Sequence, residues 1–136
     1  MSTPKDLDLT RLIAAIESSD SAYQVALYVE HAEVQITDGD SLGRAPQVLV
    51  GRPAIARWIE GMAARHIVHH VVDPDTDGDS LSFVDELHVP DGTTLIHRRT
   101  AEISGGQISQ EFVTVEAVAS STFDRRPELG ARFQLA

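Results

Sequence analysis

Asp85 is a carboxylate placed within an alternating apolar pattern. Its neighbours two and four positions away are Leu81, Phe83, Leu87 and Val89. Residues two apart share one face of a β-strand, so this pattern predicts that the carboxylate lies on the apolar side of a sheet. Burying a carboxylate is costly unless it is paired, and burial favours the protonated form, which suits a general acid or base. The alternatives are a bulge that turns Asp85 to solvent, or a structural ion pair.

Three further residues could complete an acid–base site beside this carboxylate. His97 and Arg99 share one face of the following predicted strand, and Glu111 lies on the last one. An imidazole exchanges protons near neutral pH, and a guanidinium stabilises an oxyanion or orients a carboxylate. A general acid with an anion stabiliser suffices for enolisation, epoxide opening or aldol closure. The structural alternative is a set of cross-strand ion pairs, between Arg98 or Arg99 and Glu102 or Glu111.

Two short patterns resemble metal sites only in part. On a strand, His66 and His70 would be about 13 Å apart and His69 would face the other way, so the three cannot chelate one ion unaided. The acidic segment 73–79 matches the first half of an EF-hand loop, but position twelve, where a glutamate is needed, is Val84. We therefore predict no metal site and a solvated acidic turn, with weak surface calcium binding as the alternative.

Composition excludes several classes of function. The 136 residues fit one domain, and 42% hydrophobic with 24% charged residues is typical of a folded globule. Eleven Lys and Arg against 21 Asp and Glu give a net charge of −10, so nucleic acid and anionic membranes are poor partners. There is no cysteine, glycine-rich phosphate loop or dinucleotide fingerprint, and no cofactor is expected. No apolar run reaches 18 residues, and the first nine residues include the charged Lys5, Asp6 and Asp8. This predicts a cytoplasmic protein without a membrane span or a signal peptide.

Hydrophobic periodicity predicts three helices followed by strands. Helical stripes run from Leu9 to Ile16, from Ala22 to Val29 and from Ile55 to Met62, with Thr3 as the first cap. Strands are expected at 33–37, 48–50, 66–73, 80–89, 93–104 and 107–118, with turns at 74–79, 90–92 and 105–106. The prediction is one domain over residues 1–119 and a C-terminal tail over 120–136.

This order is an α+β layout in which three short helices cover part of a curved antiparallel sheet. Because three helices cannot cover a sheet of four to six strands, we expect helices and sheet to enclose a cleft. The other face of the sheet is expected to meet a second subunit, which predicts a homodimer.

Three runs of the chain stand out as motifs: residues 26–34 (ALYVEHAEV), 50–58 (VGRPAIARW) and 106–112 (GQISQEF). Together they resemble motifs of the nuclear-transport-factor-2-like (NTF2-like) superfamily, in particular its SnoaL-like branch. The resemblance covers roughly residues 7–116. It implies a cone-shaped α+β fold with three N-terminal helices on a curved antiparallel sheet, a pocket in the concavity, and a dimer.

The resemblance implies no single chemistry. Ketosteroid isomerases, scytalone dehydratases, limonene-epoxide hydrolases, polyketide cyclases and non-catalytic binders share this fold. The isomerases' catalytic carboxylate and tyrosine match Ile36 and Leu12 here, and the acid after the last-strand tryptophan is replaced by Val113. The segment from Phe83 to Asp85 resembles the hydrolases' Arg-x-Asp strand, with Phe83 in place of the arginine.

The family alignment directs His97 and Arg99 inward and makes a set of apolar residues the pocket wall. These substrate-binding candidates are Trp58, Met62, Leu95, Val113 and Val115. The resulting hypothesis is a binder of a small, largely apolar molecule or a cofactor-independent acid–base enzyme: an isomerase, cyclase, dehydratase or epoxide hydrolase. Asp85 or Glu111 would be the acid or base, His97 a relay and Arg99 the electrostatic partner. The alternative is a non-catalytic dimeric ligand-binding or assembly module.

Overall fold

The computed structural model describes residues 7–39 and 45–118, which form three helices and six strands. The helices are α1 (Leu9–Glu17), α2 (Ser21–Ala26) and α3 (Arg52–Ala64). The strands are β1 (Tyr28–Asp38), β2 (Gln47–Val50), β3 (Val68–Asp77), β4 (Ser80–His88), β5 (Thr94–Ser104) and β6 (Gln107–Val118). The predicted α+β class and order of elements are confirmed. No helix in this part of the chain is long and apolar enough to cross a membrane.

The first two helices are capped by aspartates. Asp8 accepts a hydrogen bond from the Arg11 amide at 3.1 Å, and Asp20 accepts one from the Tyr23 amide at the same distance. Such caps satisfy amide groups that the first turn leaves without partners. The cap predicted at Thr3 lies outside the described residues.

The second helix was predicted to reach Val29, and this is wrong. It ends at Ala26, and β1 begins at Tyr28. The Ile108 amide donates to the Leu27 carbonyl at 2.7 Å, which ties this point of the chain to β6. Long-range pairing therefore overrides a helical spacing that a sequence window alone favours.

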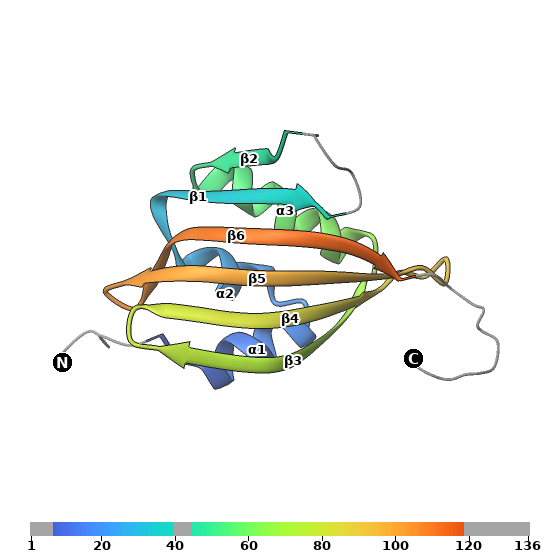
Figure 1. Cartoon of the computed structure of the whole chain (residues 1–136), viewed down its shortest axis with the longest axis horizontal. Coiled ribbons are helices and arrows are strands. Elements are labelled where there is room, and N and C mark those ends of the chain that lie inside the picture. The colour runs from blue at the N-terminus through green and yellow to red at the C-terminus, as the bar shows by residue number, and fades with distance from the viewer. Residues whose placement is uncertain (1–6, 40–44, 119–136) are drawn as a thin grey trace.

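The strands form one sheet in the order β2-β1-β6-β5-β4-β3 (Figure 1). The predicted antiparallel meander from β3 to β6 is confirmed. The sheet as a whole is mixed and not purely antiparallel, because β1 pairs with β6 in parallel. Hairpin signals predict pairing only between strands that are neighbours along the chain, so this pairing was not predicted.

The strand β3 differs from its prediction at both ends. It begins at Val68, so His66 lies before the strand, with a φ of 58°. It continues to Asp77, through part of the predicted turn, after an irregular register between Val72 and Asp75. Because β3 is an edge strand, Pro74 removes no amide that a central strand would need.

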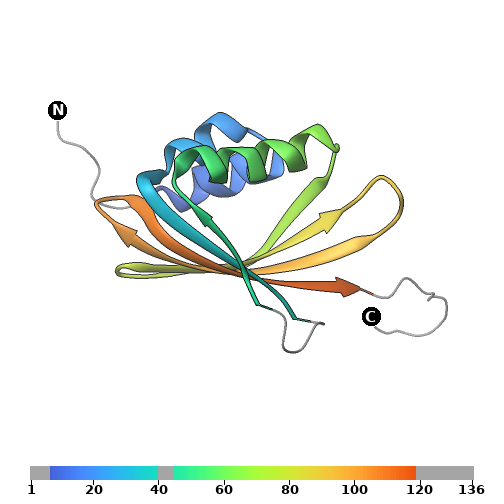
Figure 2. The same cartoon turned by 90° about the horizontal axis from the view of Figure 1, so that it is seen from above.

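All three helices lie on one face of the twisted sheet (Figure 2). The strands facing them alternate between buried and more exposed residues, most regularly in β4. The main core combines Leu12 and Ile16 of α1, Ile55 and Ile59 of α3, and apolar residues of the sheet. The inner face of the sheet is therefore the one that carries buried side chains.

The turn from β2 into α3 depends on Gly51. Its φ of 89° and ψ of 153° lie in a region that residues other than glycine avoid. Its amide donates to the Ala32 carbonyl of β1 at 2.8 Å, which fixes where α3 starts. Pro53 stands in the first turn, as predicted.

We predict that Gly51→Ala destabilises the fold by about 1–3 kcal/mol, because alanine strains this backbone conformation. Gly61→Ala is the matched control. Gly61 is inside α3, and a Cβ there would have no atom within 4 Å. That change should stabilise the protein by about 0.5–1 kcal/mol. Urea unfolding of both variants measures the two effects, and equal effects would contradict this account.

Candidate functional site

A cluster of ionisable side chains is buried on the inner face of the sheet. It consists of Tyr28 of β1, His69 of β3, Asp85 of β4, His97 and Arg99 of β5, and Glu111 of β6. Asp85 and Glu111 are both 0% exposed, so the bulge that would turn Asp85 to solvent does not occur. All four residues predicted as catalytic therefore lie inside the protein.

One half of the cluster joins Arg99 to Glu111 and Tyr28. Arg99 Nε donates to Glu111 Oε2 at 2.5 Å, and Arg99 Nη2 donates to the Tyr28 hydroxyl at 3.1 Å. The Tyr28 hydroxyl in turn donates to Glu111 Oε1. Both oxygens of Glu111 thus have partners, which is the structural ion pair considered as an alternative.

The proton affinities in this half follow from burial and charge. Burial, and then the charge of Glu111, raise the pKa of Tyr28 well above its usual range, so its hydroxyl stays a donor. Burial by itself lowers the pKa of Arg99, but the interactions with Glu111, Tyr28 and Asp85 together more than offset this and the pKa is raised overall. Arg99 therefore remains a cation in the interior.

The other half of the cluster is built around Asp85. His69 Nδ1 and Asp85 Oδ2 form a hydrogen bond of 2.8 Å, and Arg99 Nη1 lies 3.8 Å from the same oxygen. The second oxygen, Oδ1, is buried without a hydrogen-bond partner among the described residues. The carboxylate is thus held through one oxygen while the other stays open.

His97 faces Asp85 across the paired strands and has an open atom of its own. The two residues are in register between β4 and β5. His97 Nδ1 is the second buried side-chain atom that lacks a partner in the described part of the chain. Burial, followed by the charge of Arg99, lowers the pKa of His97 to about 4, so its ring is neutral at pH 7.

Aromatic rings surround the positive charge. The Trp58 ring stacks on His97 with centroids 6.4 Å apart. The Arg99 guanidinium lies 5.3 Å from the centroid of Trp58 and 4.9 Å from that of Phe83. Contacts of this kind stabilise a cation away from water. Trp58 of α3 therefore connects the ionisable cluster to the helical layer.

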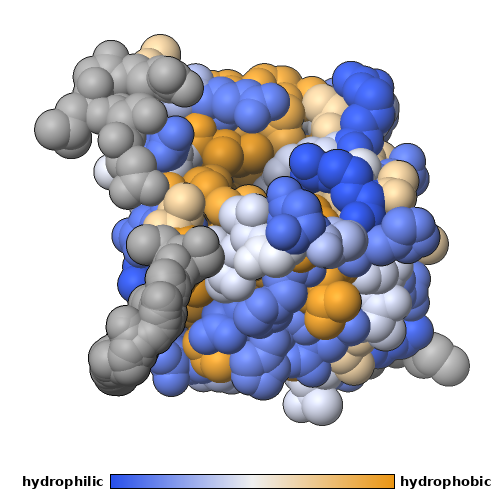
Figure 3. Space-filling model, turned by 90° about the vertical axis from the view of Figure 1, so that its right-hand side faces the viewer, coloured by the Kyte–Doolittle hydropathy of each residue, from blue (hydrophilic) through white to orange (hydrophobic). Residues whose placement is uncertain are grey.

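A second apolar cluster adjoins the open half at the β4–β5 turn end of the sheet. It contains Met62, Ile67 and Leu87, with Trp58, Val89 and Leu95 packed against it. Leu87 and Leu95 are in register, one inward position beyond the Asp85–His97 pair. Figure 3 shows apolar side chains gathered around a hollow on this side of the molecule. The open polar atoms thus have an apolar neighbourhood.

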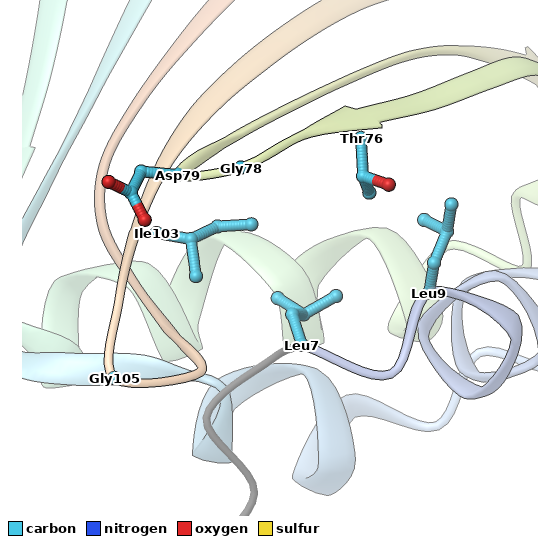
Figure 4. Close-up of a pocket in the computed structure, with 7 residues that line it drawn as sticks. All are labelled: Leu7, Leu9, Thr76, Gly78, Asp79, Ile103 and Gly105. Atoms are coloured by element: carbon cyan, nitrogen blue, oxygen red, sulfur yellow. The ribbon is translucent and has the colours of Figure 1, made fainter.

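The described residues form pockets away from this cluster. One of about 290 Å³ lies near the β3–β4 and β5–β6 turns, at the far end of the sheet (Figure 4). It is lined by Leu7, Leu9, Thr76, Gly78, Asp79, Ile103 and Gly105. Another, of about 280 Å³, is lined in part by Val115, a predicted substrate contact. Neither is lined by the buried ionisable residues.

The remaining predicted pocket-wall residues divide between the two apolar clusters. Met62 and Leu95 belong to the cluster beside the open half, and Trp58 touches both. Val113 is buried in the main core, where it pairs with Arg99 across β5 and β6. The structure therefore stacks Trp58 on His97, groups Met62 and Leu95 with Trp58 in one apolar cluster, and assigns Val113 to the core.

Two members of the cluster were missed from the sequence. Tyr28 was assigned to a helix on the spacing of Ala22 to Val29, and exposed Glu30 interrupts its alternation with buried Ala32 and Val34. His69 was weighed only as a metal ligand, although it shares its strand parity with apolar Ile67 and Val71. Among the described residues no group of three or more potential ligands is arranged to hold a metal ion.

Comparison with known proteins identifies the fold. A structure of an NTF2-like protein of unknown function from Mesorhizobium loti has a TM-score of 0.69 and 16% identity, over 79% of this chain and 87% of that one. A ketosteroid isomerase-like protein from Kribbella flavida has a TM-score of 0.65 and 14% identity, over 88% of this chain and 86% of that one. The epoxide hydrolase/cyclase-like enzyme SalBIII, which has a role in pyran ring formation in salinomycin, has a TM-score of 0.55 and 15% identity, over 79% and 87%. No family model and no curated protein sequence matches the chain.

We predict that Glu111→Gln destabilises the protein by about 3–5 kcal/mol, because it leaves the buried Arg99 without its closest counter-charge. Glu116→Gln is the matched control on the same strand. It removes the pair with Arg98 at 3.5 Å, in which both side chains are exposed, and should change stability by less than about 1 kcal/mol. Denaturant unfolding measures the free energy of unfolding of both variants. Similar losses of stability would show that the buried pair stabilises the fold no more than the exposed one.

The lowered pKa of His97 predicts a pH dependence of stability. The folded ring titrates at about 4, whereas an unfolded histidine titrates at about 6.5. The unfolded state therefore binds more protons between these values, and stability falls as the pH falls through this window. Between pH 7 and pH 5 the native protein should lose about 2 kcal/mol more than His97→Asn does. Equal losses in unfolding experiments at the two pH values would refute this assignment.

Proposed function

We propose, from the premise that this chain has the NTF2-like fold, that it binds a small, largely apolar molecule beside Asp85 and His97 and transfers a proton there. The observation that carries the proposal is a contrast within one buried cluster. Glu111 is satisfied at both oxygens, whereas Asp85 Oδ1 and His97 Nδ1 have no partner among the described residues. Buried polar atoms are almost always satisfied, so two open ones on residues paired across β4 and β5 indicate a place for a ligand atom or a water.

Asp85 is the proposed acid–base group. His69 holds its Oδ2, so Oδ1 is the oxygen free to take a proton from the substrate and return it to another substrate atom. Neutral His97 contributes a hydrogen bond to the same substrate group. Arg99 and Glu111 act as positioning residues, because their charges are already engaged with each other. No cofactor is needed for this reaction class.

Two similar structures support the class of chemistry. One is the ketosteroid isomerase-like protein and the other is the epoxide hydrolase/cyclase-like enzyme. Isomerisation, cyclisation and epoxide opening all require a proton to be moved next to an apolar skeleton. These are the reactions that we propose for this chain, and dehydration belongs to the same group.

The alternative function is ligand binding without turnover. The pairing of Arg99 with Glu111 and Tyr28 favours it, because it removes two of the four predicted catalytic groups from direct chemistry. In that case Asp85 and His97 would recognise a ligand and leave it unchanged.

A homodimer and a cytoplasmic location remain predictions. Val48, Val50 and Phe112 are exposed at 48%, 64% and 41%, and they alternate along their strands with Leu49 and Val113 of the main core, so they point away from the helices. Val48 and Phe112 lie in one row across the sheet, since both pair with Gln35. A second copy covering this row would remove their apolar surface from water. The proposed division into a domain over 1–119 and a tail over 120–136 is also untested.

We predict that Asp85→Asn strongly slows the turnover of any substrate found. The first step is a thermal-shift screen with terpene alcohols, ketones and epoxides, steroid enones and aromatic polyketide esters, since native-state ligands raise the melting temperature. Each ligand that shifts the protein is then incubated with it, and products are measured. Removing a general acid or base should lower the rate by about 100-fold or more.

Glu86→Gln is the matched control for this substitution. Glu86 is the next residue of β4 and points to the opposite side of the sheet. The Glu86→Gln variant loses one negative charge, as Asp85→Asn does. It should keep both the ligand-induced rise in melting temperature and the turnover. Binding that depends on Asp85 without any product would establish the non-catalytic alternative. Shifts unaffected by Asp85→Asn would overturn the proposed site.

A further inference from the structure

We propose that the ligand presents a hydroxyl group to Asp85 and His97, so that this site selects an alcohol on an apolar skeleton over the corresponding ketone or epoxide. The inference rests on the proposed function, because it names the class of molecule that the same site takes. Within that function it favours the reactions that start from an alcohol, which are dehydration and cyclisation through a hydroxyl, over epoxide opening and the isomerisation of a ketone. It follows from the hydrogen-bonding capacity of the two open atoms and from the charges around them.

The open oxygen of Asp85 requires a donor. Oδ2 is bound to His69 Nδ1 at 2.8 Å and lies 3.8 Å from Arg99, the surroundings of a carboxylate anion. An ionised carboxylate only accepts hydrogen bonds, so Oδ1 can be satisfied by an O–H or N–H and not by a carbonyl or ether oxygen. An acceptor placed there would bring its lone pairs against those of Oδ1.

The open nitrogen of His97 belongs to the residue that pairs with Asp85, and it also lacks a partner among the described residues. Asp85 and His97 are directly opposite in the β4–β5 register, and both side chains point inward. Side chains paired in this way start about 5 Å apart at Cβ, so one ligand atom can reach both. A hydroxyl donates its one hydrogen to Asp85 and accepts from His97, which places the proton of the neutral ring on Nδ1.

The charges of the cluster disfavour an anionic ligand. Its formally charged members are the carboxylates of Asp85 and Glu111 and the single guanidinium of Arg99. Three hydrogen bonds already join Glu111, Tyr28 and Arg99 to one another. A carboxylate on the ligand would add a negative charge next to Asp85 with no free cation in the cluster to meet it. A neutral alcohol meets the hydrogen-bonding requirement without that charge.

The skeleton that carries the hydroxyl is apolar. Leu87 and Leu95 form the next inward pair beside Asp85 and His97 on β4 and β5. Trp58 stacks on His97. A ring or branched hydrocarbon would pack on these three side chains while its hydroxyl reaches inward. Trp58 is the only tryptophan of the sequence, so its fluorescence reports on this position.

The test compares menthol with menthone, which share one skeleton and differ as alcohol and ketone. Binding to the full chain is followed by Trp58 fluorescence and by thermal shift. Menthol should bind roughly tenfold tighter or more, because a hydrogen bond to a charged group is among the stronger ones. Limonene epoxide, a second acceptor-only probe, should rank with menthone.

Asp85→Asn should reverse this order. The amide oxygen of asparagine can take the bond from His69, which leaves the NH2 group where Oδ1 stood. The open atom then donates instead of accepting, and menthone should bind tighter than menthol. Glu86→Gln is the control and should keep the native order. If Asp85→Asn does not fold, the order of affinities of the three probes for the native chain still tests the selection of a hydroxyl.

The outcomes separate this inference from the proposed function. Equal affinities for menthol and menthone, or an unchanged order in Asp85→Asn, would overturn the selection of a hydroxyl while leaving a small-molecule site. Tighter binding of menthone to the native protein would also overturn it. Failure of all three probes to bind would contradict the proposed function, and the inference with it.

Discussion

The buried charge of Arg99 is the interaction on which the rest of this site depends. Among the buried residues of the described chain it is the one lysine or arginine, and it lies between two carboxylates from neighbouring strands. Neither carboxylate could be buried cheaply without it. The register of β4, β5 and β6 brings these groups together, so the sheet must form correctly before the cluster can exist.

Arg99 does not treat the two carboxylates alike. It contacts Glu111 at 2.5 Å, and Tyr28 completes that group, whereas its distance to Asp85 is 3.8 Å. Asp85 instead depends on His69, which engages one oxygen and leaves the other open. The cluster therefore has a closed half that stabilises the fold and an open half with unsatisfied hydrogen-bonding capacity next to apolar residues.

Strand parity predicted the burial of Asp85 and Glu111, which share their faces with apolar residues, whereas the family resemblance directed His97 and Arg99 inward. The partners of these groups could not be predicted in the same way. Tyr28 reaches Glu111 through the parallel pairing of β1 with β6, which joins segments about eighty residues apart and leaves no local signal. The fold resemblance was confirmed by structures at 14–16% identity, and such identities carry the fold without its chemistry.

The most direct measurement is a high-resolution crystal structure of the whole chain grown with menthol. The account predicts an oxygen atom, from menthol or from a bound water, within hydrogen-bond distance of both Asp85 Oδ1 and His97 Nδ1. It also predicts that the bonds of Arg99 to Glu111 and Tyr28 are unchanged. A structure in which side chains of the protein itself satisfy both open atoms would contradict the account, because no polar group of a ligand would then be needed there.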